Sequence, residues 1–89
     1  MKHLSIIVSG KVQGVHYRQS ACSIALELGF CGFVRNEPNG SVYIEAEGEE
    51  AELQEFITWC KQGPPLARVS EVKCEAGELK NFSGFEIKR

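Results

Sequence analysis

The residues best suited to chemistry lie in one stretch of the sequence, Gly-Lys-Val-Gln-Gly-Val-His-Tyr-Arg, from Gly10 to Arg18. The stretch leads into a helical pattern, and the first N–H groups of a helix lack partners within the helix. Gly10 and Gly14 allow the amides from Gln13 to Arg18 to turn toward one point. The guanidinium fork of Arg18 matches two phosphate oxygens at once. These features favour an anion site; the alternative is a glycine-containing connection from which Arg18 extends into solvent.

The stretch does not carry the motifs of a nucleotide site. It lacks the Gly-Lys-Ser/Thr ending of a nucleoside triphosphate loop, and Gly10 and Gly14 do not have the spacing of a dinucleotide fingerprint. The sequence therefore predicts a site for a small anion and does not imply a nucleotide.

Asn36 is a second polar residue with chemical potential. In an extended segment, Asn36 shares a face with Gly32 and Val34, opposite to the residues between them. Its amide can donate and accept at once, so it can accept a proton of a water molecule whose other proton goes to a bound anion. The alternative is that Asn36 begins the turn formed by Glu37-Pro38-Asn39-Gly40, as asparagine commonly does. From this residue alone the turn is the better interpretation.

Hydrophobic periodicity predicts the elements that would position these residues. Alternating apolar residues predict a strand from His3 to Ser9, followed by the loop from Gly10 to Tyr17. A helix from about Arg18 to Leu28 is predicted from apolar residues at helical spacing, namely Ala21, Ile24, Ala25 and Leu28. Gly29 supplies a left-handed cap at its end.

A hairpin is expected next. Strands from Phe30 to Asn36 and from Ser41 to Glu47 flank Asn39-Gly40, a strong two-residue turn signal. The two strands should be antiparallel neighbours. The second strand is expected to turn Val42, Ile44 and Ala46 inward and Tyr43, Glu45 and Glu47 outward.

A second helix is predicted after Gly48. Glu49, Glu50 and Glu52 lie where the helix dipole favours negative charge, and Gly63-Pro64-Pro65 ends the helix. Its apolar stripe consists of Leu53, Phe56, Ile57 and Cys60. We interpret the acidic run as a solvated helix start rather than as a metal site or a patch for a basic partner.

The rest of the chain predicts two further strands. Ser70, Val72 and Cys74 alternate as a fourth strand, and residues 77–81 form a turn region. A short final strand is expected around Phe82, Phe85 and Ile87. The order βαββαβ with a short extra C-terminal strand indicates a ferredoxin-like split βαβ sandwich of the α+β class, in which two helices cover one face of an antiparallel sheet. The fold alone names no function.

Composition narrows the functional classes. A chain of 89 residues with 43% hydrophobic and 25% charged residues is expected to be a single domain, residues 1–89. The net charge of −2 argues against nucleic acid as the main partner, since that binding depends on many lysine and arginine contacts. No secretion signal or apolar run of membrane-spanning length is evident, so we expect a cytoplasmic protein without a membrane partner.

The four cysteines, Cys22, Cys31, Cys60 and Cys74, form no Cys-x-x-Cys pair and have no histidine at zinc-ligand spacing. We therefore expect no metal site. A disulfide framework is an alternative, but a reducing compartment favours free thiols. Each cysteine lies in an apolar element, which predicts that it packs in the core as a small hydrophobic residue.

Taken together, the two chemical stretches resemble those of the acylphosphatase family. Residues 10–18 match its first signature, Gly-x-Val-Gln-Gly-Val-x-Phe/Tyr-Arg, and residues 32–42, Gly-Phe-Val-Arg-Asn-Glu-Pro-Asn-Gly-Ser-Val, match its second. The resemblance extends from Leu4 to Lys88 and departs only slightly: Tyr17 stands where phenylalanine is commoner, and His16 occupies a position that the family leaves variable.

The resemblance implies hydrolysis of acylphosphates, which are carboxyl–phosphate mixed anhydrides, to a carboxylate and inorganic phosphate without metal or cofactor. The leaving group is already good, so the enzyme mainly has to hold the phosphoryl group and place a water in line. We expect Arg18 and Asn36 to be catalytic. The phosphoryl group would be bound by backbone amides of the loop, contributed by Gln13, Gly14, Val15, His16, Tyr17 and Arg18. Nothing in the sequence activates His16 as a base or Cys22 as a nucleophile.

Other expectations concern partners and rival functions. A monomer is expected, with inorganic phosphate as product and competitive inhibitor. The main rival is a non-catalytic module that binds carbamoyl phosphate or phosphate. A ferredoxin-like protein that binds RNA on its sheet is the weakest option, because such a sheet needs a basic, aromatic face.

Overall fold

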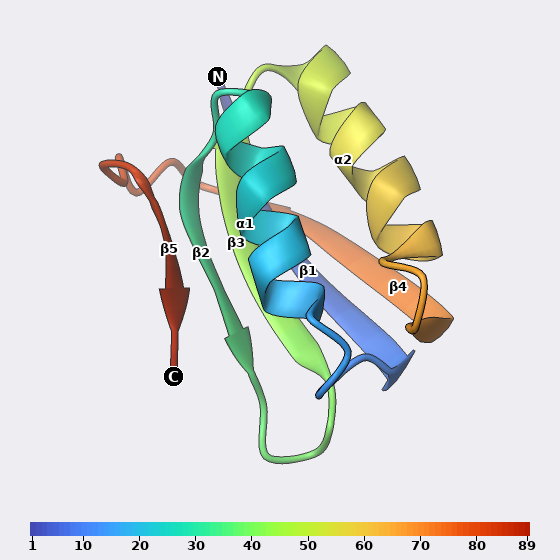
Figure 1. Cartoon of the computed structure of the whole chain (residues 1–89). Helices are drawn as coiled ribbons and strands as arrows, with labels where there is room; N and C mark the ends of the chain where they lie inside the picture. Colours follow the sequence, from blue (N-terminus) through green and yellow to red (C-terminus); the bar gives the residue numbers. More distant parts are fainter.

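A computed structural model describes all residues from 1 to 89, and it contains the expected strands and helices in the expected order. Five strands form one sheet in the order β4-β1-β3-β2-β5, and the two helices lie side by side over one face of that sheet (Figure 1). The elements are β1 (Lys2–Lys11), α1 (Tyr17–Glu27), β2 (Cys31–Asn36), β3 (Val42–Gly48), α2 (Glu50–Gln62), β4 (Arg68–Gly77) and β5 (Phe85–Lys88). The ferredoxin-like α+β prediction is confirmed.

The short C-terminal strand makes the sheet mixed. The other four strands pair antiparallel, as predicted, whereas β5 runs parallel to β2 with Gly32 opposite Phe85. Phe82, which was expected in this strand, lies before it in the loop between β4 and β5. β5 therefore forms the edge of the sheet beside β2 (Figure 1).

The core lies between the sheet and the helices. Ile6, Val8, Val34, Val42 and Ile44 are fully buried on the sheet. The helix stripes meet them, with α1 burying Ala21 and Ala25 and α2 burying Leu53, Phe56 and Cys60. Ile57, which was predicted in the second stripe, is only half-buried and lies outside the core cluster. The helices have 11 and 13 residues, and neither is long and apolar enough to cross a membrane.

The other face of the sheet differs from the prediction for β3. Glu45 and Glu47 point away from the helices, but they are buried, with 6% and 2% of their surface exposed. The buried His3 ring lies between them, with Nδ1 2.8 Å from Glu47 and Nε2 3.2 Å from Glu45. The loop between β4 and β5 covers this pair through Lys80, whose backbone N–H donates to Glu47 at 2.5 Å and whose Nζ donates to Glu45 at 2.9 Å.

The cysteines do not share one environment. All four are free thiols, and Cys60 is fully buried in the core, where burial raises its pKa to about 12. Cys22 and Cys31 are half-buried. Cys74 is exposed, which corrects the expectation of core packing, because β4 is an edge strand with little buried surface.

Candidate active site

The loop between β1 and α1 is shorter than predicted. β1 continues through Gly10 to Lys11 and carries an irregularity between Ser9 and Gly10 in its pairing with β4. At Gly10, with φ of 122°, a Cβ atom would collide with the carbonyl oxygen of Arg68. Gly10 thus allows close pairing of two strands, and the turning segment begins only after Lys11.

The backbone after Lys11 turns its amides to one side. Gly14 and His16 both have left-handed conformations, with φ of 74° and 63°. Left-handed and right-handed residues in succession form concave sets of N–H groups that bind anions. None of the N–H groups of residues 14–19 takes part in a backbone hydrogen bond outside the regular elements, and α1 contributes its N-terminal dipole there. This local geometry can bind an anion. We call the backbone amides of residues 14–18 the cradle.

The side chain of Gln13 fastens this loop to the β2–β3 hairpin. Its Nε2 donates to the carbonyl oxygens of Glu37 at 2.8 Å and Ser41 at 2.9 Å. The sequence predicted only a backbone role for Gln13. Its partners lie 24 and 28 residues away, so no local pattern could have identified them.

The side chain of Tyr17 fastens the other end of the loop. Tyr17 is buried, its hydroxyl donates to the carbonyl oxygen of Cys60 at 2.8 Å, and its ring lies 5.3 Å from that of Trp59. Burial, with smaller contributions from Cys60, raises the pKa of Tyr17 above its ordinary value. The phenol therefore stays protonated and holds the start of α1 against the end of α2.

A pocket of about 180 Å³ brings the two predicted catalytic residues together. Arg18 and Asn36 line it with three residues of the cradle, Gly14, His16 and Tyr17. Val12 and Gln19 complete the lining. Gln13 and Val15, which were also predicted to bind phosphate, do not line this pocket.

Asn36 enters the pocket from the last position of β2. It pairs with Val42, on the face that the helices cover, as strand parity predicts. Its Oδ1 is the one buried side-chain N or O atom without a hydrogen-bond partner. An unpaired buried acceptor costs free energy, on the order of 1–3 kcal/mol. This acceptor therefore needs an explanation that a turn residue does not supply.

Arg18 enters the pocket from the first turn of α1. Its Nη1 donates to the carbonyl oxygen of Lys88 at 3.1 Å. This contact depends on β5, which runs parallel to β2 at the edge of the sheet (Figure 1). The role of Lys88 was not predicted, because its carbonyl is 70 residues from Arg18 in the sequence.

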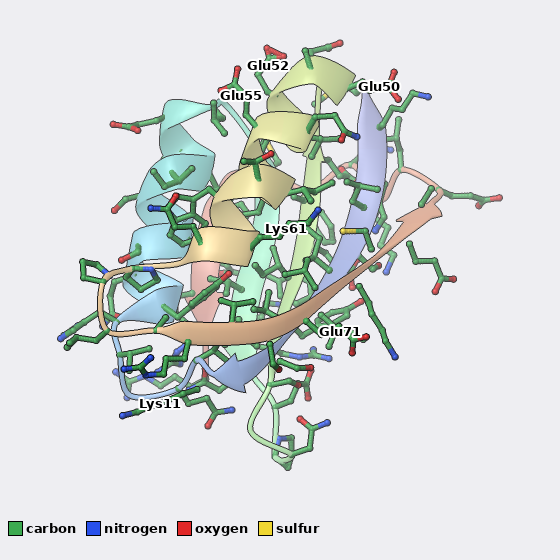
Figure 2. All side chains as sticks on the ribbon, turned by 90° about the vertical axis from the view of Figure 1, so that its right-hand side faces the viewer. Lys11, Glu50, Glu52, Glu55, Lys61 and Glu71 are labelled. Carbon is green, nitrogen blue, oxygen red and sulfur yellow. The ribbon has the colours of Figure 1, made fainter.

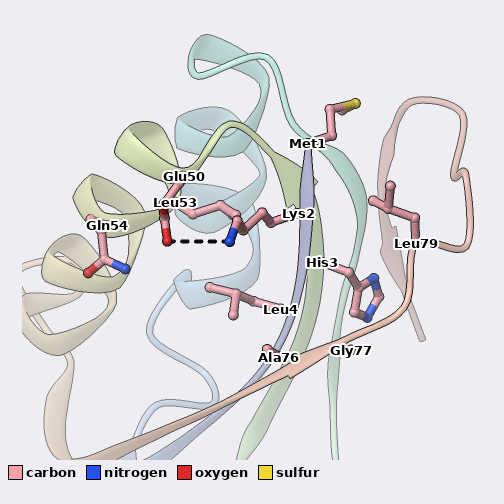
Figure 3. Close-up of a pocket in the computed structure, with 10 residues that line it drawn as sticks. All are labelled: Met1, Lys2, His3, Leu4, Glu50, Leu53, Gln54, Ala76, Gly77 and Leu79. Atoms are coloured by element: carbon pink, nitrogen blue, oxygen red, sulfur yellow. Dashed lines mark ion pairs between the residues drawn. The ribbon is translucent and has the colours of Figure 1, made fainter.

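A larger cavity, of about 390 Å³, lies at the opposite end of β1 (Figure 3). Apolar side chains, including Leu4, Leu53 and Leu79, contribute to its lining, and Lys2 forms an ion pair with Glu50 at 3.8 Å across it. It contains no residue of the cradle and no unpaired buried polar atom. No group of three or more metal-ligating side chains is arranged to hold a metal ion anywhere in the chain.

Comparisons with known proteins identify the family of the chain. The family model described as acylphosphatase matches residues 4–87. The chain is 49% identical to an acylphosphatase of Acaryochloris marina, covering 97% of this chain and 92% of the relative. It is 50% identical to one of Methylococcus capsulatus, covering 100% and 98%. It superimposes on the crystal structure of acylphosphatase from Bacillus subtilis with a TM-score of 0.97 and 34% identity, over the full length of both chains. The chain belongs to the acylphosphatase family and is a hydrolase of acylphosphates.

Proposed function

We propose that the cradle holds the phosphoryl group of an acylphosphate while Asn36 directs a water molecule at its phosphorus. The strongest support is that Asn36 lines the same pocket as Arg18 and that its buried Oδ1 has no hydrogen-bond partner within the fold. As an acceptor, it can take a hydrogen bond from a water and leave that water's lone pair free to attack. The second proton of the water then faces the bound phosphoryl oxygens.

The cradle and Arg18 stabilise the charge on the phosphoryl oxygens. The amides of Gly14 to Arg18 and the α1 dipole supply partial positive charge, and the guanidinium supplies a full charge with two donors. Because Nη1 is already bonded to the Lys88 carbonyl, the rest of the fork is held in one orientation. Preorganised donors of this kind favour a transition state whose charge spreads over the equatorial oxygens.

Hydrolysis of the acylphosphate needs no separate general base. The water oxygen forms a bond to phosphorus, and the bond from phosphorus to the acyl oxygen breaks. The acyl group leaves as a carboxylate with the electron pair, and it is a weak enough base to need no proton. The proton of the water passes to a phosphoryl oxygen, so the products are a carboxylate and inorganic phosphate. His16 and Cys22 have no part in the step.

Substitution of Arg18 and Asn36 tests these roles, because the two variants should fail differently. Arg18→Gln removes a charge-assisted contact to ground state and transition state alike, so turnover of benzoyl phosphate should be lost. Phosphate affinity, measured as competitive inhibition in the wild type and as direct binding in the variant, should fall at least about tenfold. Asn36→Ala should lower kcat severely while phosphate still binds.

Asn39→Ala is the matched control for Asn36→Ala. Asn39 belongs to the same hairpin, where its Oδ1 accepts from the backbone N–H of Ser41 at 3.0 Å, but it does not line the pocket. This variant should lose stability and keep kcat. If Asn36→Ala keeps most of its kcat, Asn36 is a turn residue and the water-directing role is wrong. Phosphate binding without turnover by the wild type would instead indicate a binding module.

The proposal extends to the working form of the protein. Residues 1–89 act as one catalytic domain, since the five strands form one sheet and the two helices pack on it over one core. The net charge of −2 argues against binding to nucleic acid. Four free thiols suit the cytoplasm. Undiminished turnover of benzoyl phosphate in EDTA is the expected sign of metal-independent catalysis.

A further inference from the structure

We propose that a groove beside the phosphoryl pocket holds the acyl part of the substrate and selects acyl groups that carry a second negative charge. This inference rests on the mechanism proposed above, because it needs the phosphoryl group to sit in the cradle. It goes further by naming the class of substrate: acylphosphates whose acyl group bears an additional anionic group, such as a second carboxylate.

The groove lies where the leaving group should go. It has a volume of about 370 Å³ and borders the phosphoryl pocket at Gly14, which lines both. Neither Asn36 nor Arg18 lines it. In an in-line displacement, the leaving oxygen is opposite the attacking water. A water held at Asn36 therefore directs the acyl group away from Asn36, and the groove adjoins the pocket through Gly14 rather than through Asn36 or Arg18.

Two basic side chains that form no ion pair line this groove. Lys11, at the end of β1 (Figure 2), is paired in register with Arg68, at the start of β4. Both side chains are exposed, and neither forms an ion pair with any carboxylate of the chain. Like charges directly opposite each other in a sheet are destabilising. An anion held between them would remove that repulsion, and the fold supplies none itself.

Apolar side chains also contribute to the groove. Val15, Pro65 and Leu66 line it, and Leu66 is 69% exposed. Its exposure leaves apolar surface available to a ligand. The combination fits an acyl group with an apolar body and an anionic end, the body against Leu66 and the charge at Lys11 and Arg68. Acetyl phosphate would use none of these features beyond the phosphoryl site.

Two probe substrates that differ by one carboxylate test the inference. Benzoyl phosphate reports on the phosphoryl site, and 4-carboxybenzoyl phosphate adds the second charge. The quantity of interest is the ratio of kcat/KM for the carboxylated substrate to that for the plain one, compared between wild type and variant. This comparison cancels the intrinsic reactivity of each anhydride. Lys11→Gln and Arg68→Gln should each lower the ratio about twofold to fivefold, and the double variant should lower it further.

Lys61→Gln is the matched control for net charge. Lys61 is also exposed and unpaired, but it lies on α2 outside the groove (Figure 2). Its substitution should leave the ratio unchanged. An unchanged ratio in both groove variants, or an equal fall in Lys61→Gln, would overturn the inference. If benzoyl phosphate turnover proves independent of Arg18 and Asn36, the proposed mechanism fails instead, whatever the ratio does.

A second measurement needs no variant. In the wild-type enzyme, benzene-1,4-dicarboxylate should inhibit benzoyl phosphate hydrolysis at a lower concentration than benzoate does, because only the dicarboxylate can place a charge at the far end of the groove. Equal inhibition by the two acids would contradict the selection of a second negative charge.

Discussion

Tyr17 shows how a single residue can serve both the core and the site. Its backbone N–H is in the loop that we propose to hold phosphate, while its buried side chain joins the start of α1 to the end of α2 through Cys60 and Trp59. The position of the cradle thus depends on a contact within the core. Asn36 differs from Tyr17, because its buried oxygen has no partner within the fold.

Tyr17→Phe should destabilise the protein without removing apolar mass. The change leaves the carbonyl oxygen of Cys60 buried without its donor, at a cost of about 1–2 kcal/mol. For a domain of this size, the thermal midpoint should fall by roughly 5–15 °C. The matched control is Thr58→Val, which removes an exposed hydroxyl bond to Gln54 and should shift the midpoint much less. Equal shifts of the thermal midpoint in the two variants would show that the buried hydrogen bond stabilises the protein no more than the exposed one.

At the scale of elements, two edge features organise the site and the far face of the sheet. β5 brings the Lys88 carbonyl to Arg18, and the loop before β5 covers Glu45 and Glu47 on β3. Both features depend on the C-terminal segment, which lies along β2 at the edge of the sheet (Figure 1). We expect this segment to matter for catalysis and for the pH dependence of stability.

Deleting Lys88 and Arg89 should lower kcat/KM for benzoyl phosphate, because Arg18 loses the acceptor that orients it. The expected loss is about threefold to tenfold, the usual value of one hydrogen bond. Lys88→Ala is the control, since it keeps the carbonyl and removes only the side chain with its contacts to Phe33 and Glu86. A truncated enzyme as active as Lys88→Ala would show that the Lys88 carbonyl does not position Arg18.

The pKa values of Glu45 and Glu47 predict a loss of stability in acid. Burial raises both pKa values, but hydrogen bonds outweigh it, for Glu45 from Lys80 and Tyr43 and for Glu47 from Lys80, His3 and Phe82. The net shift is downward from 4.5. Their stabilisation is therefore complete above the unfolded-state pKa of 4.5 and is lost as pH falls through the lower pKa of the folded state.

Urea unfolding at pH 7, 5, 4 and 3 measures this dependence. Between pH 5 and pH 3, the free energy of unfolding of Glu47→Gln should fall less than that of the wild type, because the variant has one fewer shifted carboxyl group. Glu55→Gln, which changes an exposed and unpaired carboxylate on α2, should follow the wild type. Parallel curves for wild type and Glu47→Gln would contradict the assignment of the acid sensitivity to this cluster.

At the scale of the whole molecule, local patterns predicted the architecture well. Helical spacing identified both apolar stripes, and Asn39-Gly40 identified the hairpin that places Asn36 at the end of β2. The two signatures identified the residues that the pocket brings together, Arg18 and Asn36. Neighbours in sequence decide the stripes and the hairpin, whereas the two site residues were identified through the resemblance to a family.

The features that the sequence did not predict are contacts between distant segments. The bond from Arg18 to the Lys88 carbonyl and the bond from Tyr17 to the Cys60 carbonyl span 70 and 43 residues. Every residue has a backbone carbonyl, so the residue type does not reveal that Cys60 or Lys88 accepts such a bond. The burial of Glu45 and Glu47 was missed for a related reason, since alternation identifies a face of the sheet but not the loop that covers it.

The most direct measurement of the central claim is a titration of the ¹⁵N-labelled protein with inorganic phosphate, followed by ¹H–¹⁵N correlation spectra. The cradle predicts that the largest and saturable shifts belong to the amides of residues 14–18, with the Asn36 side chain also affected. Residues 1–4, beside the cavity of Figure 3, serve as the internal control and should not move. In Arg18→Gln the loop shifts should require at least about tenfold more phosphate. If the largest shifts lie outside this loop, or if its amides stay unmoved at phosphate concentrations that inhibit turnover, the cradle is not the phosphoryl site.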